Sequence, residues 1–396
     1  MMKMKISTLV RNIKPSGIRR FFDLAEKDPD VISLGVGEPD FTTPPAILEA
    51  AKKSLAEGST HYTSNDGMFL LRQKLSEYLL EKFDLHYNYD CEMIITIGAS
   101  EAMDIAITAL ISPGDEVLIP EPCFVSYAPC TILAGGVPVM VPTRSAHGFK
   151  VVAEDLEKYV TPRTRALLMS YPNNPTGAVM TRRELEPVAD FAKKYDLAVI
   201  TDEVYAELTY GRRHTSIAAL PGMKERTFLV GGFSKAFAMT GWRVGYLCGP
   251  CDAVQQARKV HQYRVMCPPT ISQAAALEAL CSGELEVRRM VAEYDRRRKV
   301  MCRGLRDLGF EVPEPRGAFY VFPSVHHTGL SSEEFAEKLL EKAKVAIVPG
   351  SAFGPSGEGH VRCSYATSIE KIHEALNRIE TFLADIKTSR TNHIMR

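Results

Sequence analysis

Short apolar runs that alternate with helical patterns dominate the middle of this chain and constrain its fold more than any other feature. Runs typical of strands occupy residues 93–97, 116–119, 137–141, 166–170, 197–201, 227–231 and 244–248. Patterns typical of helices lie between some of them, for example over residues 100–111 and 181–195. Strands that alternate with helices form mostly parallel sheets that helices cover on both faces. We therefore predict an α/β fold with such a sheet, and we expect ligands at the carboxyl ends of its strands.

The chain changes character after about Leu280. A long, highly charged helical pattern covers residues 287–305, and a closing helix starts near Ser368. Shorter runs typical of strands lie between these helices, at residues 319–322, 345–348 and 361–365. This part predicts a smaller α+β domain, with a junction near Ser282-Gly283.

Composition narrows the function class. The 48 basic residues balance 48 acidic ones, whereas a dedicated nucleic-acid binder normally carries a basic excess. No run reaches the 18 or more apolar residues that a membrane span needs. The first 17 residues contain no apolar stretch and no small-residue cleavage site, so we expect no secretory signal. The nine cysteines, an odd number, suggest free thiols in a reducing cytoplasm.

Polar and glycine residues follow several predicted strands. Gly98-Ala99-Ser100 lies where a strand turns into a helix, a position that exposes backbone N–H groups to an anion, although such turns are common in α/β proteins. The rigid turn 171–177 contains Asn174 beside a strand end. Asp202 and Tyr205 follow the next strand, and an aspartate directly after an apolar run either caps a helix or needs a partner.

The most informative segment is residues 231–243, a glycine-rich and apolar stretch that contains Lys235. A lysine removed from water has a depressed pKa and can act as a nucleophilic amine. Arg243 follows eight residues later, beside the only tryptophan of the chain. Either residue alone is also typical of a surface loop, so their combination with the strand-end residues carries the argument.

Taken in order, these motifs closely resemble the fold-type I pyridoxal-phosphate-dependent aminotransferases of class I and II. The matching motifs are Gly98-Ala99-Ser100, Tyr171–Gly177, Asp202-x-x-Tyr205, Ser234-Lys235 and Gly241-Trp242-Arg243. The resemblance extends from Ser16-Gly17-Ile18-Arg19 through residues 34–40 to residues 361–365. It implies an aspartate aminotransferase-like fold with a large cofactor domain over residues 48–282. It also implies that residues 1–47 and 283–396, from both chain ends, build the small domain.

The resemblance also implies roles for the residues of the reaction centre. Lys235 would bind the cofactor as an internal aldimine and would then move the proton at the substrate Cα. Asp202 would pair with the pyridine nitrogen and keep it protonated. Tyr205 and Asn174 would hydrogen-bond the phenolic oxygen.

The remaining implied roles concern the phosphate, the ring and the substrate. Arg243 and the Ala99-Ser100 turn would hold the phosphate, and Phe124 would stack on the ring. Arg362 would bind the substrate α-carboxylate, helped by Asn174 and the backbone at Gly37. Tyr62 would reach the phosphate of a neighbouring subunit, which implies a homodimer with shared sites.

Two positions depart from the family pattern. Many relatives carry a hydroxyl residue three positions before the lysine, where this chain has Gly232, so Ser234 or Ser100 would have to replace that phosphate ligand. Many relatives stack a tryptophan where this chain has Phe124, which keeps the stacking and loses an indole donor.

The expected activity is amino transfer between an L-amino acid, of aspartate or aromatic type, and a 2-oxo acid such as 2-oxoglutarate in a ping-pong cycle. A C–S lyase or another β-eliminating enzyme on the same fold is the alternative, because fold and cofactor do not determine which bond breaks. A non-catalytic amino-acid-sensing module is a distant third. It requires an upstream winged-helix segment, and the resemblance already begins at about residue 16, which leaves no room for one.

Two further motifs receive a different interpretation. Cys248-Gly-Pro-Cys251 has the spacing of a thioredoxin-type redox centre, but it follows a strand inside the aminotransferase pattern, where a turn is expected. We therefore predict a turn there and leave a redox role open. His326-His327 lacks a third ligand at metal spacing, so we expect no metal.

Overall fold

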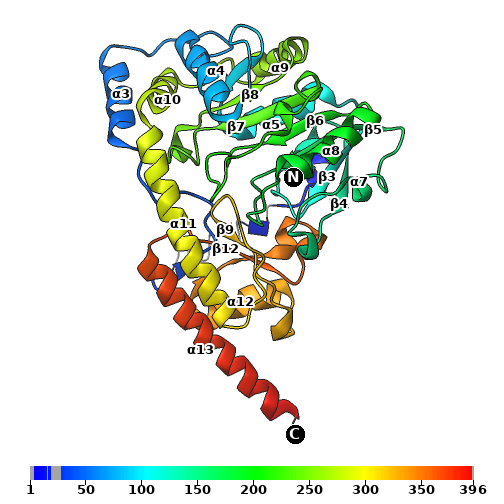
Figure 1. The fold of residues 1–396 in the computed structure, drawn as a ribbon, viewed down its shortest axis with the longest axis vertical. Helices are drawn as coiled ribbons and strands as arrows, with labels where there is room; N and C mark the ends of the chain where they lie inside the picture. The colour runs from blue at the N-terminus through cyan, green and yellow to red at the C-terminus, as the bar shows by residue number, and fades with distance from the viewer. Residues whose placement is uncertain (1–3, 16, 19–27, 395–396) are drawn as a thin grey trace.

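A seven-stranded sheet forms the centre of the computed structural model, which describes residues 4–15, 17–18 and 28–394. Its strand order is β2-β8-β7-β6-β5-β3-β4, and β8 alone runs antiparallel to its neighbours (Figure 1). The strands are β2 (Met93–Thr96), β3 (Glu116–Glu121), β4 (Val137–Pro142), β5 (Thr164–Ser170), β6 (Ala198–Asp202), β7 (Thr227–Gly232) and β8 (Gly245–Cys248). The predicted α/β class and the mostly parallel sheet are confirmed.

Alternate side chains of this sheet enter different cores, as the two-residue period of a strand requires. On β5, Ala166 and Leu168 face the core under α5 and α9, whereas Leu167 and Met169 face the core under α8. The helices of this part are α3 (Pro45–Ala56), α4 (Phe69–Phe83), α5 (Gly98–Leu110), α6 (Tyr127–Leu133), α7 (Ala153–Leu156), α8 (Arg182–Lys194), α9 (Cys251–Arg264) and α10 (Thr270–Ser282). Because both faces of the inner strands are covered, these strands are mostly apolar and form nearly continuous apolar runs in the sequence.

The predicted helix over 181–195 illustrates how local signals set an element. Thr181 is the N-cap of α8, and its side chain and that of Glu184 form a reciprocal capping box. The apolar residues of α8 recur on one face and lie in the core against β5 and β6.

The chain after residue 283 builds the smaller part of the molecule, which lies below the large sheet in Figure 1. Its helices are α11 (Glu284–Asp307), α12 (Ser332–Ala343) and α13 (Ile369–Ile394), and both α11 and α12 pack against α13. The apolar run 345–348 forms two strands rather than the single predicted one. β10 (Val345–Ala346) pairs with β1 (Ile32–Ser33), whereas β11 (Val348–Pro349) joins β12 (Val361–Ser364) and β9 (Tyr320–Val321). The run divides because two different sheets supply its hydrogen-bond partners.

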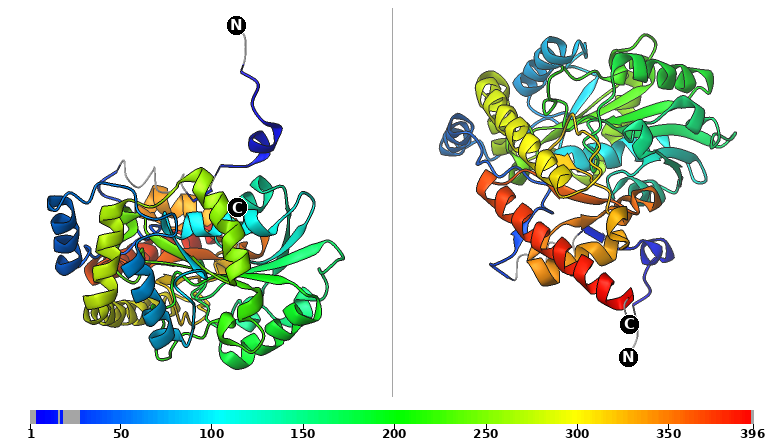
Figure 2. Two further views of the ribbon diagram at one scale, coloured as in Figure 1. Left: turned by 90° about the horizontal axis from the view of Figure 1, so that it is seen from above. Right: turned by 60° about the horizontal axis from the view of Figure 1, so that its bottom comes forward.

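The N-terminal segment lies at the periphery of the molecule, where its short helix touches α6. The short helix α1 (Thr8–Asn12) sits on a segment that projects away from the rest of the chain (Figure 2). Ser16 and Arg19 of the first matching motif lie outside the described residues.

Short 3₁₀ turns complete the structure, at Ser145–His147, Ile217–Ala219, Lys224–Arg226, Thr240–Trp242, His326–Thr328, Gly350–Phe353 and Pro355–Gly357. Within the described residues, no helix is both long enough and apolar enough to cross a bilayer.

Candidate active site

A cavity of about 340 Å³ lies where the strands of the large sheet end and α5 begins. Its volume falls within the range of small-molecule sites. The cavity collects almost all of the predicted site residues, from seven separate parts of the chain: Gly37, Ala99, Ser100, Phe124, Asn174, Asp202, Tyr205, Lys235, Arg243 and Arg362. Tyr62 is the exception: its side chain is 82% exposed, and it is not among the described residues that line the cavity.

Lys235 follows β7 and projects into this cavity. Its Nζ donates a hydrogen bond to the backbone carbonyl of Gly37 at 2.6 Å. Burial lowers the pKa of the amine to about 8, against the opposing charge of Glu38 and with a further contribution from the nearby cations Arg362 and Arg243. A substantial fraction of the amine is therefore neutral near physiological pH, which is the state a nucleophile or general base needs.

Asp202 is the last residue of β6, and its carboxylate lies at the cavity wall. The hydroxyl of Tyr127 donates to Oδ2 at 2.7 Å, and the backbone N–H of Val204 donates to Oδ1 at 3.2 Å. Burial raises the pKa of Asp202, while the Tyr127 hydrogen bond acts in the opposite direction. A buried carboxylate held in this way is suited to pair with a protonated ring nitrogen.

The start of α5 and Arg243 form an anion-binding cradle. Gly98 has φ +68°, and a Cβ there would lie 2.7 Å from Nη2 of Arg243, so a glycine is needed for the guanidinium to approach the helix start. Nη1 of Arg243 donates to the carbonyl of Thr240 at 2.8 Å, which holds the side chain in place. Backbone N–H groups at a helix N-terminus together with an arginine are a favourable site for phosphate.

Gly232, where many relatives carry a hydroxyl residue, lies beside the start of α5. A Cβ at Gly232 would lie 3.7 Å from the backbone nitrogen of Ala99, so this position borders the cradle. Ser100 and Ser234 both line the same cavity and bring hydroxyl groups to it. The replacement of the phosphate ligand by one of these serines stays a prediction.

Arg362, on β12, is almost completely buried, with 2% of its surface exposed. Nη1 donates to Oδ1 of Asn174 at 2.9 Å and Nη2 donates to the carbonyl of Gly35 at 2.5 Å. The guanidinium also lies 4.4 Å from the ring centroid of Tyr320. Gly37 also lines the cavity, and its carbonyl accepts the hydrogen bond from Lys235, so its expected part in binding a substrate carboxylate stays a prediction.

Several lining residues escaped the sequence analysis. The hydroxyl of Tyr320 lies 2.8 Å from that of Tyr205, and burial raises the pKa of Tyr205 well above its ordinary value. The other lining residues that were not predicted are Ile18, Glu38, Met103, Ser126, Tyr127, Ser170, Val204 and Thr240. The sequence around Tyr127 shows only a tyrosine three residues after Phe124. The partner of its hydroxyl, Asp202, lies 75 positions further along the chain.

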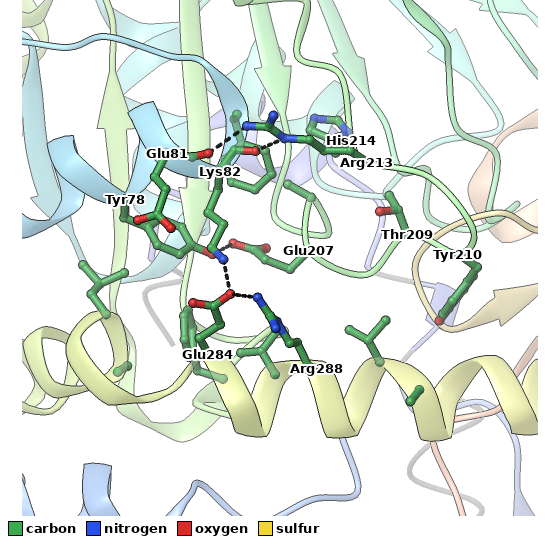
Figure 3. A pocket seen from close by; sticks show the side chains of 18 of the residues that line it. Tyr78, Glu81, Lys82, Glu207, Thr209, Tyr210, Arg213, His214, Glu284 and Arg288 are labelled. Atoms are coloured by element: carbon green, nitrogen blue, oxygen red, sulfur yellow. Dashed lines mark hydrogen bonds and ion pairs between the residues drawn. The ribbon is translucent and has the colours of Figure 1, made fainter.

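A larger cavity of about 540 Å³ lies between α4, the loop around residues 206–214 and the start of α11 (Figure 3). None of the described residues that line it is a predicted site residue. Its polar groups bind one another: Lys82 and Arg288 both contact Glu284, and Tyr78 donates to Glu207. Because these groups are mutually satisfied, we place the chemistry in the smaller cavity.

Comparisons with known proteins agree with this geometry. A family model described as aminotransferase class I and II matches residues 29–379. The aromatic-amino-acid aminotransferase 2 of Thermococcus litoralis and the aspartate aminotransferase of Pyrococcus abyssi are each 47% identical, over 97% of this chain and 100% of their own. The crystal structure of an aromatic aminotransferase from Pyrococcus horikoshii OT3 superposes with a TM-score of 0.89 at 48% identity, over 93% of this chain and 99% of that one.

Together, fold and cavity define a pyridoxal-phosphate enzyme of fold type I. The chain belongs to the class I and II aminotransferase family, and it is an aminotransferase that uses pyridoxal phosphate as its cofactor. The residues of the cavity fit this cofactor. They offer an amine with a lowered pKa, a buried carboxylate and a phosphate cradle at a helix start, at Lys235, Asp202 and Arg243 respectively.

Proposed function

We propose that this enzyme moves the amino group between an L-amino acid of aspartate or aromatic type and a 2-oxo acid such as 2-oxoglutarate. The observation that carries the proposal is the convergence of Lys235, Asp202 and Arg362 on one cavity. The aspartate and aromatic specificities in the names of the relatives support the substrate class. Those names give no support to a C–S lyase, which stays an outcome of the test.

Each residue has a proposed task. Pyridoxal phosphate, when bound, supplies a ring that withdraws electrons from the substrate Cα. Lys235 binds the cofactor. As the neutral amine it then accepts the proton from the substrate Cα and delivers a proton to the cofactor carbon, C4′, that was the aldehyde. Asp202 keeps a negative charge beside the ring nitrogen, and the hydrogen bond from Tyr127 holds that carboxylate in place.

The remaining tasks are binding and orientation. Arg243, Ala99 and Ser100 hold the phosphate, and Phe124 packs against the ring face. Tyr205 and Asn174 bind the phenolic oxygen. Arg362 fixes the α-carboxylate of the amino acid with two N–H groups. Carboxylate binding is common to the amino acid and the oxo acid, so one arginine serves both halves of a ping-pong cycle.

The absorption spectrum of the purified protein tests the proposal. Single amino acids are added in turn to the loaded enzyme, without any oxo acid. We expect aspartate, glutamate or aromatic amino acids to convert the visible band to that of the aminated cofactor, with one equivalent of oxo acid formed. Release of ammonia and pyruvate from a β-substituted amino acid would identify a lyase. A loaded protein whose band responds to none of these amino acids would contradict the proposed substrate class.

The lowered pKa of Lys235 makes a separate pH prediction. The neutral amine is the nucleophile, so attachment of pyridoxal phosphate to the apoprotein should accelerate as the pH rises and level off above about 8. A lysine with the ordinary pKa of 10.5 would continue to accelerate through pH 9. Stopped-flow absorbance from pH 6 to 10 measures the rate, and Nα-acetyl-lysine with the same aldehyde serves as the control. Parallel profiles for protein and control would contradict the prediction.

We also propose a homodimer in which Tyr62 completes the phosphate site of the partner subunit. Tyr62 and Tyr263 are 82% and 92% exposed, and Met266 nearby is 42% exposed. Hydrogen bonds bring their segments together, because Asn65 Nδ2 donates to the carbonyl of Met266 at 2.9 Å. An apolar surface of this kind is suited to burial against a second copy. Sedimentation velocity should give the mass of a dimer, and a monomer at micromolar concentration would overturn this proposal.

Two further expectations belong to the proposal. We propose a large domain over residues 48–282 and a small one from residues 1–47 and 283–396, since the seven-stranded sheet lies within the first range and β1 pairs with β10. Limited proteolysis that cuts the chain near residue 283 earlier than it cuts within the seven-stranded sheet would support this division.

We also propose a cytoplasmic location, which the nine free thiols support and cell fractionation would test.

A further inference from the structure

Two cysteines far apart in the sequence meet at the end of the sheet that is remote from the cavity. Cys91 stands two residues before β2, and Cys251 is the first residue of α9, which follows β8. β2 and β8 pair antiparallel with Met93 opposite Cys248, and the same register continues to place Cys91 opposite Pro250. Cys91 is therefore adjacent to the residue that precedes Cys251.

Backbone and side-chain contacts hold the two segments together. The N–H of Gly249 donates to the carbonyl of Glu92 at 3.1 Å, so the pairing of the two chains extends beyond the strands. The neighbouring thiol of Cys251, chiefly through side-chain hydrogen bonding, raises the pKa of Cys91 to about 11. Cys251 is exposed and Cys91 is half-buried, so reagents from solvent can reach the pair.

The structure separates this pair from the Cys248-Gly-Pro-Cys251 motif. Cys248 lies on β8 with no exposed surface, and burial raises the pKa of its thiol strongly. Cys251 is on the outside of the molecule, at the start of a helix. The neighbour of Cys251 is thus a residue from a distant part of the chain, and the motif partner is withdrawn into the core.

We propose that Cys91 and Cys251 are a redox-modification site, which closes to an intramolecular disulfide when the enzyme meets a peroxide or a small-molecule disulfide. Hydrogen peroxide would oxidise the exposed sulfur of Cys251 to a sulfenic acid and release one water. The sulfur of Cys91 would then displace the hydroxyl group, forming the S–S bond and releasing a second water. The two thiols together lose two electrons and two protons, and the peroxide accepts these electrons and protons as it becomes two waters. Two equivalents of a thiol reductant reverse the bond by exchange.

The position of the bond predicts what it does. It would close a loop over residues 91–251, which contains all seven strands of the large sheet, and so restrict the unfolded chain. Oxidised enzyme should therefore unfold at a temperature a few degrees higher than reduced enzyme. Turnover should be unchanged, because Cys91 precedes β2 whereas the cavity begins beyond the other end of that strand, at Ala99.

Thiol counting and peptide mapping of the loaded enzyme test the proposal. After treatment with hydrogen peroxide and then with maleimide under denaturing conditions, nine reactive thiols should fall to seven. Unreduced digestion should yield one linked pair of peptides containing Cys91 and Cys251, which dithiothreitol separates. A Cys248–Cys251 link, a link between two chains, or modification of Cys251 alone would each overturn the proposal.

Single serine variants provide matched controls. Cys91→Ser and Cys251→Ser should each abolish both the paired loss of thiols and the shift in unfolding temperature. Cys281→Ser removes another exposed cysteine, on α10, and should leave both effects intact. If a variant at residue 91 or 251 fails to fold, the wild-type peptide map decides the question alone. Equal temperature shifts in all three variants would contradict the assignment.

Discussion

Lys235→Ala should bind pyridoxal phosphate without a covalent bond and transfer amino groups about 10³-fold more slowly than the wild type, or worse. The amine is the only group of the cavity placed to act both as cofactor nucleophile and as proton carrier among the described lining residues, and its pKa of about 8 suits both tasks. Alanine leaves a space that water can occupy, and water is a much weaker base. Single-turnover absorbance after mixing with an amino acid measures the proton-transfer step directly.

The control for this prediction is Lys82→Ala. Lys82 is an ion-paired lysine of the larger cavity, bound to Glu284, and its loss should leave turnover within about twofold of the wild type. A small primary amine added in solution should restore part of the Lys235→Ala activity, because it supplies the missing base. If Lys235→Ala keeps more than a tenth of the wild-type rate, Lys235 does not carry the proton.

Arg362→Lys should raise the KM of both the amino acid and the oxo acid and lower kcat/KM about 10- to 100-fold. An arginine presents two parallel N–H groups to a carboxylate, whereas a lysine presents one point charge. Loss of one hydrogen bond to a charged group costs about 1.5–3 kcal/mol, which corresponds to that factor. Lysine also cannot reach both Asn174 and Gly35, so the side chain itself is less well held. Steady-state kinetics with each substrate varied in turn measure the effect.

Arg298→Lys is the matched control. Arg298 is also buried and hydrogen-bonded, to Asp295 and Glu314, but it does not line the active-site cavity. Its replacement should lower the unfolding temperature without a change in KM. The affinity for pyridoxal phosphate should be unchanged in Arg362→Lys, since the arginine is assigned to the substrate. A fall in cofactor affinity with an unaltered KM would show that the assignment is wrong.

Most of the large sheet was predictable because its strands are buried on both faces. Burial on both faces makes a strand apolar throughout, and such a run is visible in the sequence without knowledge of its neighbours. The direction of β8 was not predictable, because an apolar run has the same composition in either direction. The division of residues 345–348 into two strands was not predictable either, since it depends on which strands lie beside this segment.

The candidate site shows the same limit to what the sequence predicts. Lys235, Asp202, Asn174, Arg243 and Arg362 were predicted from motifs that the chain shares with the aminotransferase family, and the structure brings all five to one cavity. Tyr127 and Tyr320 were missed for a physical reason. An aromatic residue in an apolar segment is ordinary core unless its hydroxyl meets a polar partner, and that partner lies 75 positions away for Tyr127 and 115 for Tyr320.

By itself, the sequence determined the α/β class, the positions of most strands and, through the motifs shared with the family, which side chains were expected at the site. These properties depend on local periodicity and on the chemistry of single side chains. Only the tertiary structure decided which groups meet: Arg362 with Asn174, Tyr127 with Asp202, and Cys251 with Cys91 instead of Cys248. Such contacts depend on strand order and register, which arise from the packing of the whole chain and leave no local trace in the sequence.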